Sequence, residues 1–226
     1  MASEHEHISP RFYVLRNDFE GPYDTAFEKP DDSRSAGAPT CPRCGRYIGM
    51  RDWLPPYRVE LEVHGEKGAG DFAMGTGFGL LLSERMAELF RKKGLRGFSG
   101  FHPVEVVKMN ARAKRMGVPR YFSVTADYGR AAVDEAHSRL RRAEPLECPE
   151  CRNPGMDGVY GFAIEPGTWD GLDVFRPRGL QGDLVVSERF AELVAEGGLT
   201  NVLLTPTERF TWDPLRKGPP ADRARA

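Results

Sequence analysis

The residues with the clearest chemical potential are four cysteines in two Cys-x-x-Cys pairs, Cys41/Cys44 and Cys148/Cys151. One pair can present two thiolates from a tight turn, and two pairs supply the four sulfur ligands of a tetrahedral zinc site. The pairs are much further apart than the roughly 15–20 residues that separate the pairs of a local zinc ribbon. The sequence therefore predicts one structural zinc per chain, with Cys41, Cys44, Cys148 and Cys151 as its ligands.

Two other uses of these cysteines stay open from the residues alone: a thiol redox pair and simple buried thiols. A redox Cys-x-x-Cys opens a helix, which lowers the thiol pKa. Here glycines and prolines follow both pairs, so neither pair is predicted to open a helix. Four thiolates also leave no open coordination position, so the predicted zinc is structural, not catalytic.

The sequence has no catalytic signature. Motifs of the Gly-x-Ser-x-Gly, His-Glu-x-x-His and Walker types are absent from it. The glycines between Gly75 and Gly79 precede a predicted strand, whereas a phosphate loop follows one, so we interpret them as a turn. We therefore expect no enzymatic activity and assign no catalytic residue.

The elements that position the cysteines repeat along the chain. The segments Leu81–Phe98 and Val185–Val202 align without a gap and share Ser-Glu-Arg and Ala-Glu-Leu. The two Cys-Pro-x-Cys pairs recur at nearly the same offset, as do the aromatic segments that begin at Arg11 and Arg120. This agreement predicts a duplication of nearly the whole chain.

Each copy of the repeat contains a short helix with its own start and stop signals. Ser83 and Ser187 are typical N-cap residues, and the following glutamates suit the positive end of the helix dipole. Gly94 and Gly198 suit the left-handed position that ends a helix. We expect about three helical turns in each copy, and we assign the shared Ser-Glu-Arg to capping and packing.

Strands are expected to outnumber helices. The predicted fold class is α+β: a β-rich, internally duplicated chain whose two similar halves each contain a Ser-Glu-Arg helix and share the four-cysteine zinc site about a pseudo-two-fold axis. Strands are predicted over 57–63, 80–82, 104–107, 184–186 and 201–204, and a further helix over 130–142. The predicted parts are a flexible N-terminal arm (1–10), an N-terminal repeat (11–115), a C-terminal repeat (116–213) and a disordered tail (214–226).

Composition limits the partners and the location. The formal charge is −1, with 32 basic and 33 acidic residues, so the excess of positive charge that drives nucleic-acid binding is missing. No segment approaches the roughly 20 apolar residues of a membrane-spanning helix, and the first ten residues contain no apolar core. We expect a cytoplasmic protein with no membrane partner.

The paired Cys-Pro-x-Cys turns, together with Val-Ser-Glu-Arg-Phe-Ala-Glu from Val186 and the Gly-Leu-Thr-Asn that ends at Asn201, resemble the double-CXXCG motif proteins. These are paralogues abundant in myxobacteria, and part of the family is described as immunity proteins for toxins that swarming cells exchange. The resemblance covers residues 11–213. The chain departs from the family pattern at Arg152, where a second Cys-x-x-Cys-Gly would have glycine.

The resemblance implies a cytoplasmic, non-enzymatic protein that binds and neutralises a cognate protein toxin. The toxin-binding surface and the oligomeric state are not indicated by the sequence. Candidate contact regions are Trp53, Trp169, Trp212 and the loops 64–79 and 165–182, where the two copies differ. The alternative function is that of a zinc-dependent nucleic-acid-binding or regulatory protein, which would use basic residues between Lys108 and Arg120.

Overall fold

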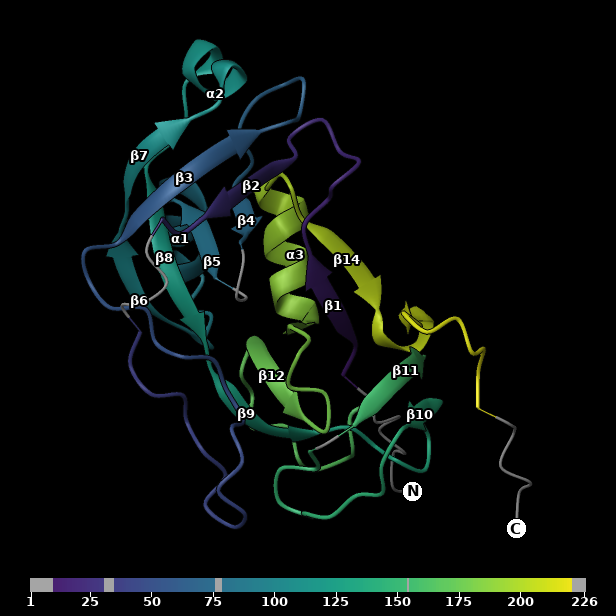
Figure 1. Ribbon diagram of the computed structural model, residues 1–226. Helices are drawn as coiled ribbons and strands as arrows, with labels where there is room; N and C mark the ends of the chain where they lie inside the picture. Colours follow the sequence, from purple (N-terminus) through teal and green to yellow (C-terminus); the bar gives the residue numbers. More distant parts are fainter. Residues whose placement is uncertain (1–9, 31–34, 76–78, 154, 221–226) are drawn as a thin grey trace, which may run out of the picture.

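The computed structural model describes residues 10–30, 35–75, 79–153 and 155–220 (Figure 1). This part of the chain is rich in β-structure: its strands form four sheets, with three α-helices and one 3₁₀ helix. The β-rich character predicted from the sequence is confirmed. None of the helices in the described ranges has the length and apolar character needed to cross a bilayer.

The largest sheet combines the first strand of the chain with strands from its C-terminal part. Its order is β14-β1-β13-β12-β9, and the first four strands pair antiparallel. β9 adds to β12 in parallel. The strands are β14 (Leu203–Pro206), β1 (Phe12–Arg16), β13 (Val185–Ser187), β12 (Val174–Arg178) and β9 (Tyr128–Ala132).

A four-stranded sheet has a matching antiparallel order, β6-β8-β5-β4. Its strands are β6 (Phe98–Pro103), β8 (Tyr121–Ala126), β5 (Leu80–Ser83) and β4 (Phe72–Met74). In this sheet Tyr121 of β8 lies opposite Ser83, and in the larger sheet Phe12 of β1 lies opposite Ser187. Each sheet is thus completed by an aromatic strand from the other part of the chain, because β1 lies within 11–115 and β8 within 116–213.

Two smaller sheets flank this pair. One has the order β2-β3-β7, formed by Thr25–Glu28, Arg58–Val63 and Glu105–Met109. The other has the order β10-β11-β15, formed by Leu140–Arg142, Met156–Tyr160 and Thr211–Trp212. The predicted alternation in β3 is confirmed, because Val59, Leu61 and Val63 are buried while the residues between them are not.

The two Ser-Glu-Arg helices are α1 (Glu84–Lys92) and α3 (Glu188–Gly197). The Ser83 and Ser187 side chains accept hydrogen bonds from the backbone N–H groups of Met86 and Phe190, so both predicted N-caps are confirmed. Both helices end with a glycine at positive φ, followed by a leucine whose N–H donates to the carbonyl five residues earlier. This is the Schellman ending expected from the sequence.

The helices meet in the main core. Phe90 of α1 and Phe190 of α3 pack edge to face with ring centroids 6.4 Å apart, and both contact Phe98 of β6. Both helical phenylalanines are buried, together with residues of the two larger sheets. The core is therefore continuous between the two parts of the chain.

The helix predicted over 130–142 was wrong, because the end of β9, a turn and β10 occupy this segment. The segments 64–79 and 165–182, expected to be loops, contain β4 and β12. The strand predicted over 104–107 is confirmed as part of β7, but β6 comes first after α1 and occupies the place in its sheet that β14 occupies in the other. The segment between β7 and β8 contains the short helix α2 (Ala111–Met116), with Asn110 as its N-cap, and the 3₁₀ helix η2 spans Thr207–Arg209.

The predicted ends of the chain are described only in part. Residues 1–9 of the N-terminal arm and 221–226 of the tail lie outside the described residues, as do 76–78 of the predicted Gly75–Gly79 turn. The backbone N–H of Gly75 donates to the carbonyl of Gly79 at 2.9 Å, so the two ends of this segment lie close together. In the tail, the backbone N–H of Gly218 donates to Asp213 at 2.9 Å.

Candidate metal centre

The four cysteines form one cluster, with all four Sγ atoms within 4.8 Å of one another. Sγ of Cys41 lies 3.9 Å from Sγ of Cys148, and Sγ of Cys44 lies 3.7 Å from Sγ of Cys151. Tetrahedral zinc with Zn–S bonds of about 2.3 Å requires sulfur atoms about 3.8 Å apart. These distances suit a shared metal and are far longer than the S–S bond of a disulfide, about 2.05 Å.

Each cysteine pair lies on a tight turn that a backbone hydrogen bond closes, and further backbone N–H groups of the two turns donate to the sulfurs of Cys41 and Cys148. In the first turn Gly45 N–H donates to Cys41 O at 2.9 Å, and in the second Arg152 N–H donates to Cys148 O at 2.9 Å. Neither pair opens a helix. This arrangement lacks the helix N-terminus that activates a redox Cys-x-x-Cys.

The second turn keeps its shape although Arg152 stands where the first turn has glycine. Gly45 has φ 72° and Arg152 has φ 54°, so both are in the left-handed region. A side chain in this region costs roughly 1–2 kcal/mol. The Arg152 guanidinium donates to Val133 O at 2.7 Å and pairs with Glu165 at 2.5 Å, and these contacts offset the cost.

The two thiols of the second pair have different pKa values because their surroundings differ. Hydrogen bonds from the backbone N–H groups of Cys151 and Glu150 lower the pKa of Cys148 to about 7. Burial raises the pKa of Cys151 to about 12 in the absence of metal. Because a thiol binds metal as the thiolate, metal binding by this cluster releases protons.

Further contacts connect the two turns. Asn153 Nδ2 donates to Tyr47 O at 3.3 Å, and Arg46 forms an ion pair with Glu147. Ile48 is buried with the cysteines, and Tyr128 packs against them. The cluster therefore joins the loop after β2 to the loop after β10.

A second set of polar residues, absent from the sequence predictions, joins the halves at the helices. The buried carboxylate of Asp71 accepts hydrogen bonds from Ser83 Oγ at 2.7 Å, Arg85 Nε at 3.1 Å and the backbone N–H of Thr200 at 2.9 Å. Arg85 also donates to Gly197 O at 2.8 Å. Asp71 and Arg85 thus connect the start of α1 to the end of α3.

Asp173 makes the same contacts for α3. It accepts from Ser187 Oγ at 2.8 Å, Arg189 at 3.3 Å and the backbone N–H of Arg96 at 3.0 Å, while Arg189 donates to Lys93 O at 3.3 Å. The arginine of Ser-Glu-Arg thus has a structural role at both helices, as predicted. The sequence contains a signal for this arrangement: an aspartate precedes each N-cap serine, Asp71 before Ser83 and Asp173 before Ser187.

The tryptophans have different environments. Trp169 packs on Phe12 and donates its Nε1–H to Leu172 O at 2.8 Å, which makes it part of a core cluster. Trp53 contacts Tyr57, and Trp212 is exposed at the end of β15. Trp53 is half-buried against a core cluster, so Trp212 is the most accessible of the three tryptophans to a partner.

No protein-family model matches this chain, and no curated protein sequence matches it. The geometry of the cluster therefore carries the argument for its chemistry. Four convergent sulfur atoms, supported by backbone N–H groups and by two tight turns, can hold one metal ion. Sulfur-only, tetrahedral coordination is typical of zinc or iron–sulfur chemistry.

Proposed function

We propose that this protein is a non-enzymatic, cytoplasmic immunity protein that binds and neutralises a cognate bacterial toxin. The proposal rests on the resemblance carried by the two Cys-Pro-x-Cys pairs. It is supported by their geometry, because the two pairs meet in one cluster that can stabilise a rigid scaffold. A rigid surface loses less conformational entropy on binding, which favours the tight binding that neutralisation requires.

The metal in this proposal is one structural zinc per chain. Zinc has no geometric preference from its d electrons and accepts four thiolates at tetrahedral positions. The Sγ distances of 3.7 and 3.9 Å fit that geometry. Four protein ligands fill the coordination sphere, so the role of the metal is to stabilise the contact between the two turns.

We also propose that the two halves arose by duplication. The matching sheet orders support this proposal, as do the matched contacts of Asp71 and Asp173. A further matched pair is Arg11 with Glu188 and Arg120 with Glu84, in which a residue next to each aromatic strand binds the first turn of the opposite helix.

Co-expression tests the function. A toxin encoded next to this protein should kill cells when expressed alone and should be tolerated when the two proteins are expressed together. Cys148→Ser should abolish protection because the metal scaffold is lost, whereas Glu88→Gln, on the exposed face of α1, should protect fully. The proposal is wrong if the folded, metal-loaded protein neither binds the toxin nor protects the cells.

Alanine substitutions in the segments 64–79 and 165–182 test the toxin-binding surface. Glu66 and Lys67 lie exposed in the loop that precedes β4, and Asp170 lies exposed in the loop that precedes β12. If these loops contact the toxin, their substitution should weaken binding without changing zinc content. Full binding by all three variants would exclude these positions from the toxin contact.

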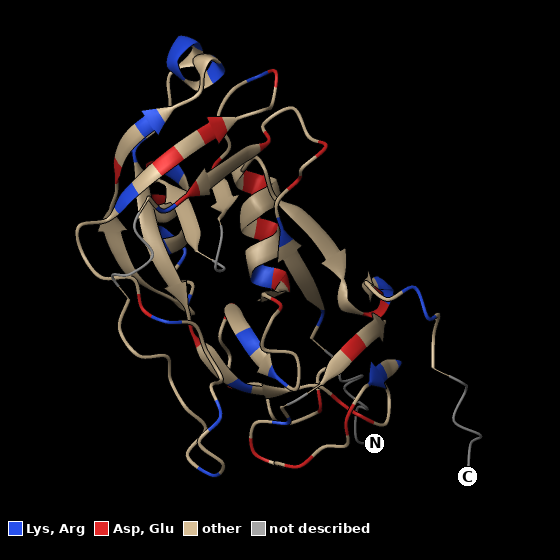
Figure 2. Cartoon of the chain, in the orientation of Figure 1, with Lys and Arg blue, Asp and Glu red and all other residues tan. Residues whose placement is uncertain are grey.

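A nucleic-acid-binding function is the second candidate. The short helix α2 carries Arg112, Lys114 and Arg115, which form a basic end of the molecule (Figure 2). Phosphate binding by these residues would make affinity fall steeply with salt. Absence of DNA and RNA binding at about 50 mM salt, where such contacts are strong, would remove this candidate.

A further inference from the structure

An apolar pocket of about 440 Å³ lies between strand β1 of the largest sheet and strands β2 and β3 of the neighbouring sheet. Its floor is formed by Leu15 of β1, Phe27 of β2 and Leu184, which directly precedes β13. All three side chains are buried. The volume is within the roughly 300–1,000 Å³ of ligand sites, so this surface can receive an apolar group from a partner.

The pocket brings together two segments in which the two copies of the proposed repeat differ. Met74, at the end of β4, belongs to the segment 64–79, and Gly182 is the last residue of the segment 165–182. Both residues line the pocket. Two of the contact regions expected from the sequence therefore meet at one concave surface.

An exposed aromatic side chain lies at the mouth of the pocket. Phe19 lines the pocket and is 65% exposed. It belongs to a turn that is closed by a hydrogen bond from Gly21 N–H to Asp18 O at 3.1 Å. The buried Asn17 fixes the start of this loop, because its Oδ1 accepts a hydrogen bond from Met74 N–H at 2.9 Å. Since the loop is held in place, a partner that packs on Phe19 orders little additional chain.

Acidic side chains lie beside the opening. Glu28 of β2 and Glu62 of β3 line the pocket and are exposed, and Figure 2 shows acidic residues along β3. Glu28 lies directly opposite Glu60 in the β2–β3 pair, and like charges at opposing positions destabilise a sheet. Lys108 pairs with Glu60 at 2.5 Å. It also interacts electrostatically with Glu28 and Glu62, so one ammonium faces three carboxylates.

The pocket has little positive charge of its own. Among the described residues that line it, one is basic, Arg16, and its guanidinium pairs with Asp183 at 2.5 Å. Glu28 and Glu62 are the two carboxylates that line the pocket beyond this pair. Glu62 lies 3.3 Å from a ring nitrogen of His64, which compensates its charge only when the imidazole is protonated. The opening therefore suits a cationic partner.

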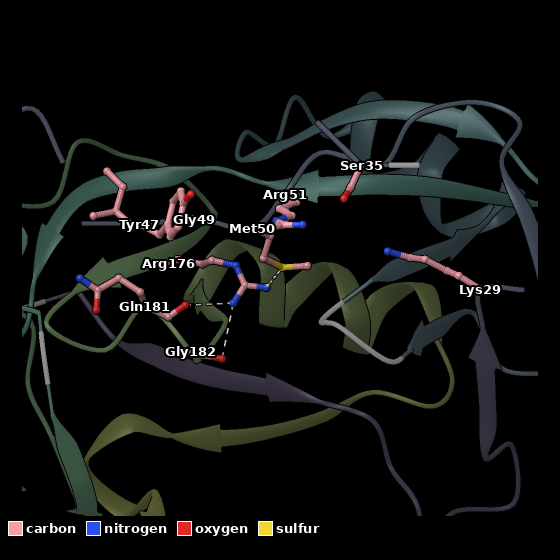
Figure 3. A pocket seen from close by; sticks show the side chains of 10 residues that line it. Lys29, Ser35, Tyr47, Gly49, Met50, Arg51, Arg176, Gln181 and Gly182 are labelled. Atoms are coloured by element: carbon pink, nitrogen blue, oxygen red, sulfur yellow. Dashed lines mark hydrogen bonds between the residues drawn. The ribbon is translucent and has the colours of Figure 1, made fainter. Parts of the chain in front are cut away.

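Lys29 and Arg176 line a different pocket, which is shown in Figure 3 and shares Gly182 with the apolar one. Figure 3 shows the Lys29 side chain directed into that second pocket. Arg176 is only 2% exposed and donates to the carbonyl oxygens of Gln181 at 3.1 Å and Gly182 at 3.4 Å, which holds the shared wall in place. Neither cation is among the described residues that line the apolar pocket.

We propose that the apolar pocket is the contact site for the toxin and receives an apolar side chain that the toxin presents between lysine or arginine residues. This inference rests on the proposed toxin-neutralising function and adds where the toxin binds and what kind of segment it presents. The apolar side chain packs on Phe19, and the flanking cations pair with Glu28 and Glu62. A packed aromatic residue supplies much of the binding energy of an interface, whereas charges at its rim speed association.

Surface plasmon resonance with the purified toxin encoded next to this protein, and with the full, metal-loaded chain, tests the aromatic contact. Phe19→Ala should weaken binding by about tenfold or more, mainly through faster dissociation. Because Phe19 is largely exposed, its replacement should leave the circular dichroism spectrum and the zinc content unchanged. Trp212→Ala, which removes an exposed aromatic side chain outside the pocket, should leave binding unchanged.

The same measurement at several salt concentrations tests the acidic rim. E28K/E62K should slow association by about tenfold or more at low salt and reduce its salt dependence. The control E88K/E192K makes the same change in net charge at exposed positions of α1 and α3 and should have a much smaller effect. Unchanged binding by either Phe19→Ala or E28K/E62K would overturn this proposal alone, provided that the unaltered protein binds the toxin. Absence of toxin binding by the unaltered protein would overturn the proposed function as well.

Discussion

Arg152 adopts the same left-handed backbone conformation after the second cysteine pair as Gly45 adopts after the first, with φ 54° and 72°. The departure of this chain from the Cys-x-x-Cys-Gly pattern therefore changes the side chain and preserves the turn. The arginine also gains a use that glycine cannot have. Its guanidinium fixes the second turn to Val133 and Glu165.

Substitutions at Arg152 should separate these two effects. Arg152→Ala keeps a side chain at positive φ and loses both contacts, so it should lower the free energy of unfolding by about 1–2 kcal/mol. Arg152→Gly loses the same contacts and relieves the backbone cost, so it should be more stable than Arg152→Ala by about 1 kcal/mol. Denaturant titration measures both values.

Gly45→Ala provides the matched control in the first turn. It introduces the backbone cost without removing any side-chain contact and should destabilise the protein by roughly 1–2 kcal/mol. Equal stabilities of the Gly and Ala variants at position 152 would mean that the left-handed conformation is not retained in solution.

Metal analysis should find one zinc per chain. Because the four sulfurs come from two distant turns, replacing either Cys41 or Cys148 by serine should remove most of the bound metal and lower the melting temperature. Arg43→Gln, at an exposed position of the first turn, should change neither the bound metal nor the melting temperature. Elemental analysis together with thermal unfolding checks this prediction, and a zinc content well below one per chain in the unaltered protein would contradict it.

Acid should also release the metal, because thiolates must be protonated as it leaves. The metal-free cluster has one thiol with its pKa lowered to about 7 and one raised to about 12. Zinc affinity should therefore fall as the pH is lowered through neutrality. A zinc-sensitive dye measures this change, and an affinity independent of pH would show that the thiols are not the ligands.

The sequence was sufficient to predict the cysteine cluster, because two Cys-x-x-Cys pairs with no helix after either have few other stable uses. It was also sufficient to predict the helix ends at Ser83 and Gly94 and at Ser187 and Gly198, because a helix cap depends on residues that are neighbours in the chain. Arg176 could not be found in this way. Its burial arises from tertiary contacts with Met50 and the 181–182 turn, for which the sequence holds no local signal.

Strand pairing also depends on tertiary contacts for which the sequence holds no local signal. The aromatic segments that form β1 and β8 were identified as parts of a repeat, but the sheets that they join were not predicted. Local pattern does not determine which partner a strand pairs with, and the structure places β1 beside β13 and β8 beside β5. The wrong helix at 130–142 has a related cause, because its apolar spacing fitted a helix while Val133 lies in a core built with β12.

The Asp71 and Asp173 contacts should contribute similarly to stability. Alanine at either position leaves a serine hydroxyl, an arginine and a backbone N–H without their buried acceptor, which should cost about 2–3 kcal/mol. Glu88→Ala, at an exposed position of α1, should cost less than about 0.5 kcal/mol. Chemical denaturation compares the three variants, and a neutral Asp71→Ala would show that this contact does not hold the helices together.

The pH dependence of stability should reveal Asp71 directly. Burial opposes its ionisation, but hydrogen bonds from Arg85, Ser83 and Thr200 outweigh this effect and lower its pKa below the usual 3.8. A carboxyl with a lowered pKa stabilises the fold fully above its unfolded pKa, and the stabilisation is lost as the pH falls through the folded pKa. The unaltered protein should thus lose more stability than Asp71→Asn when the pH falls below about 4. Parallel losses in the two proteins would contradict this assignment.

Fragments should reveal how far the two halves depend on each other. The fragment 1–115 retains β5 and β6 but lacks β8, the strand that lies between them, and the fragment 116–226 lacks β1, the strand between β13 and β14. Each fragment would also hold only two of the four cysteines. We expect each to be unfolded or aggregated alone, as judged by circular dichroism and size-exclusion chromatography, because the missing strand exposes the core around Phe90 and Phe190. Co-expression should restore a 1:1 complex that binds one zinc, and Cys41→Ser in the first fragment should weaken it. A stable, monomeric fold of either fragment alone would show that its sheet does not need the exchanged strand.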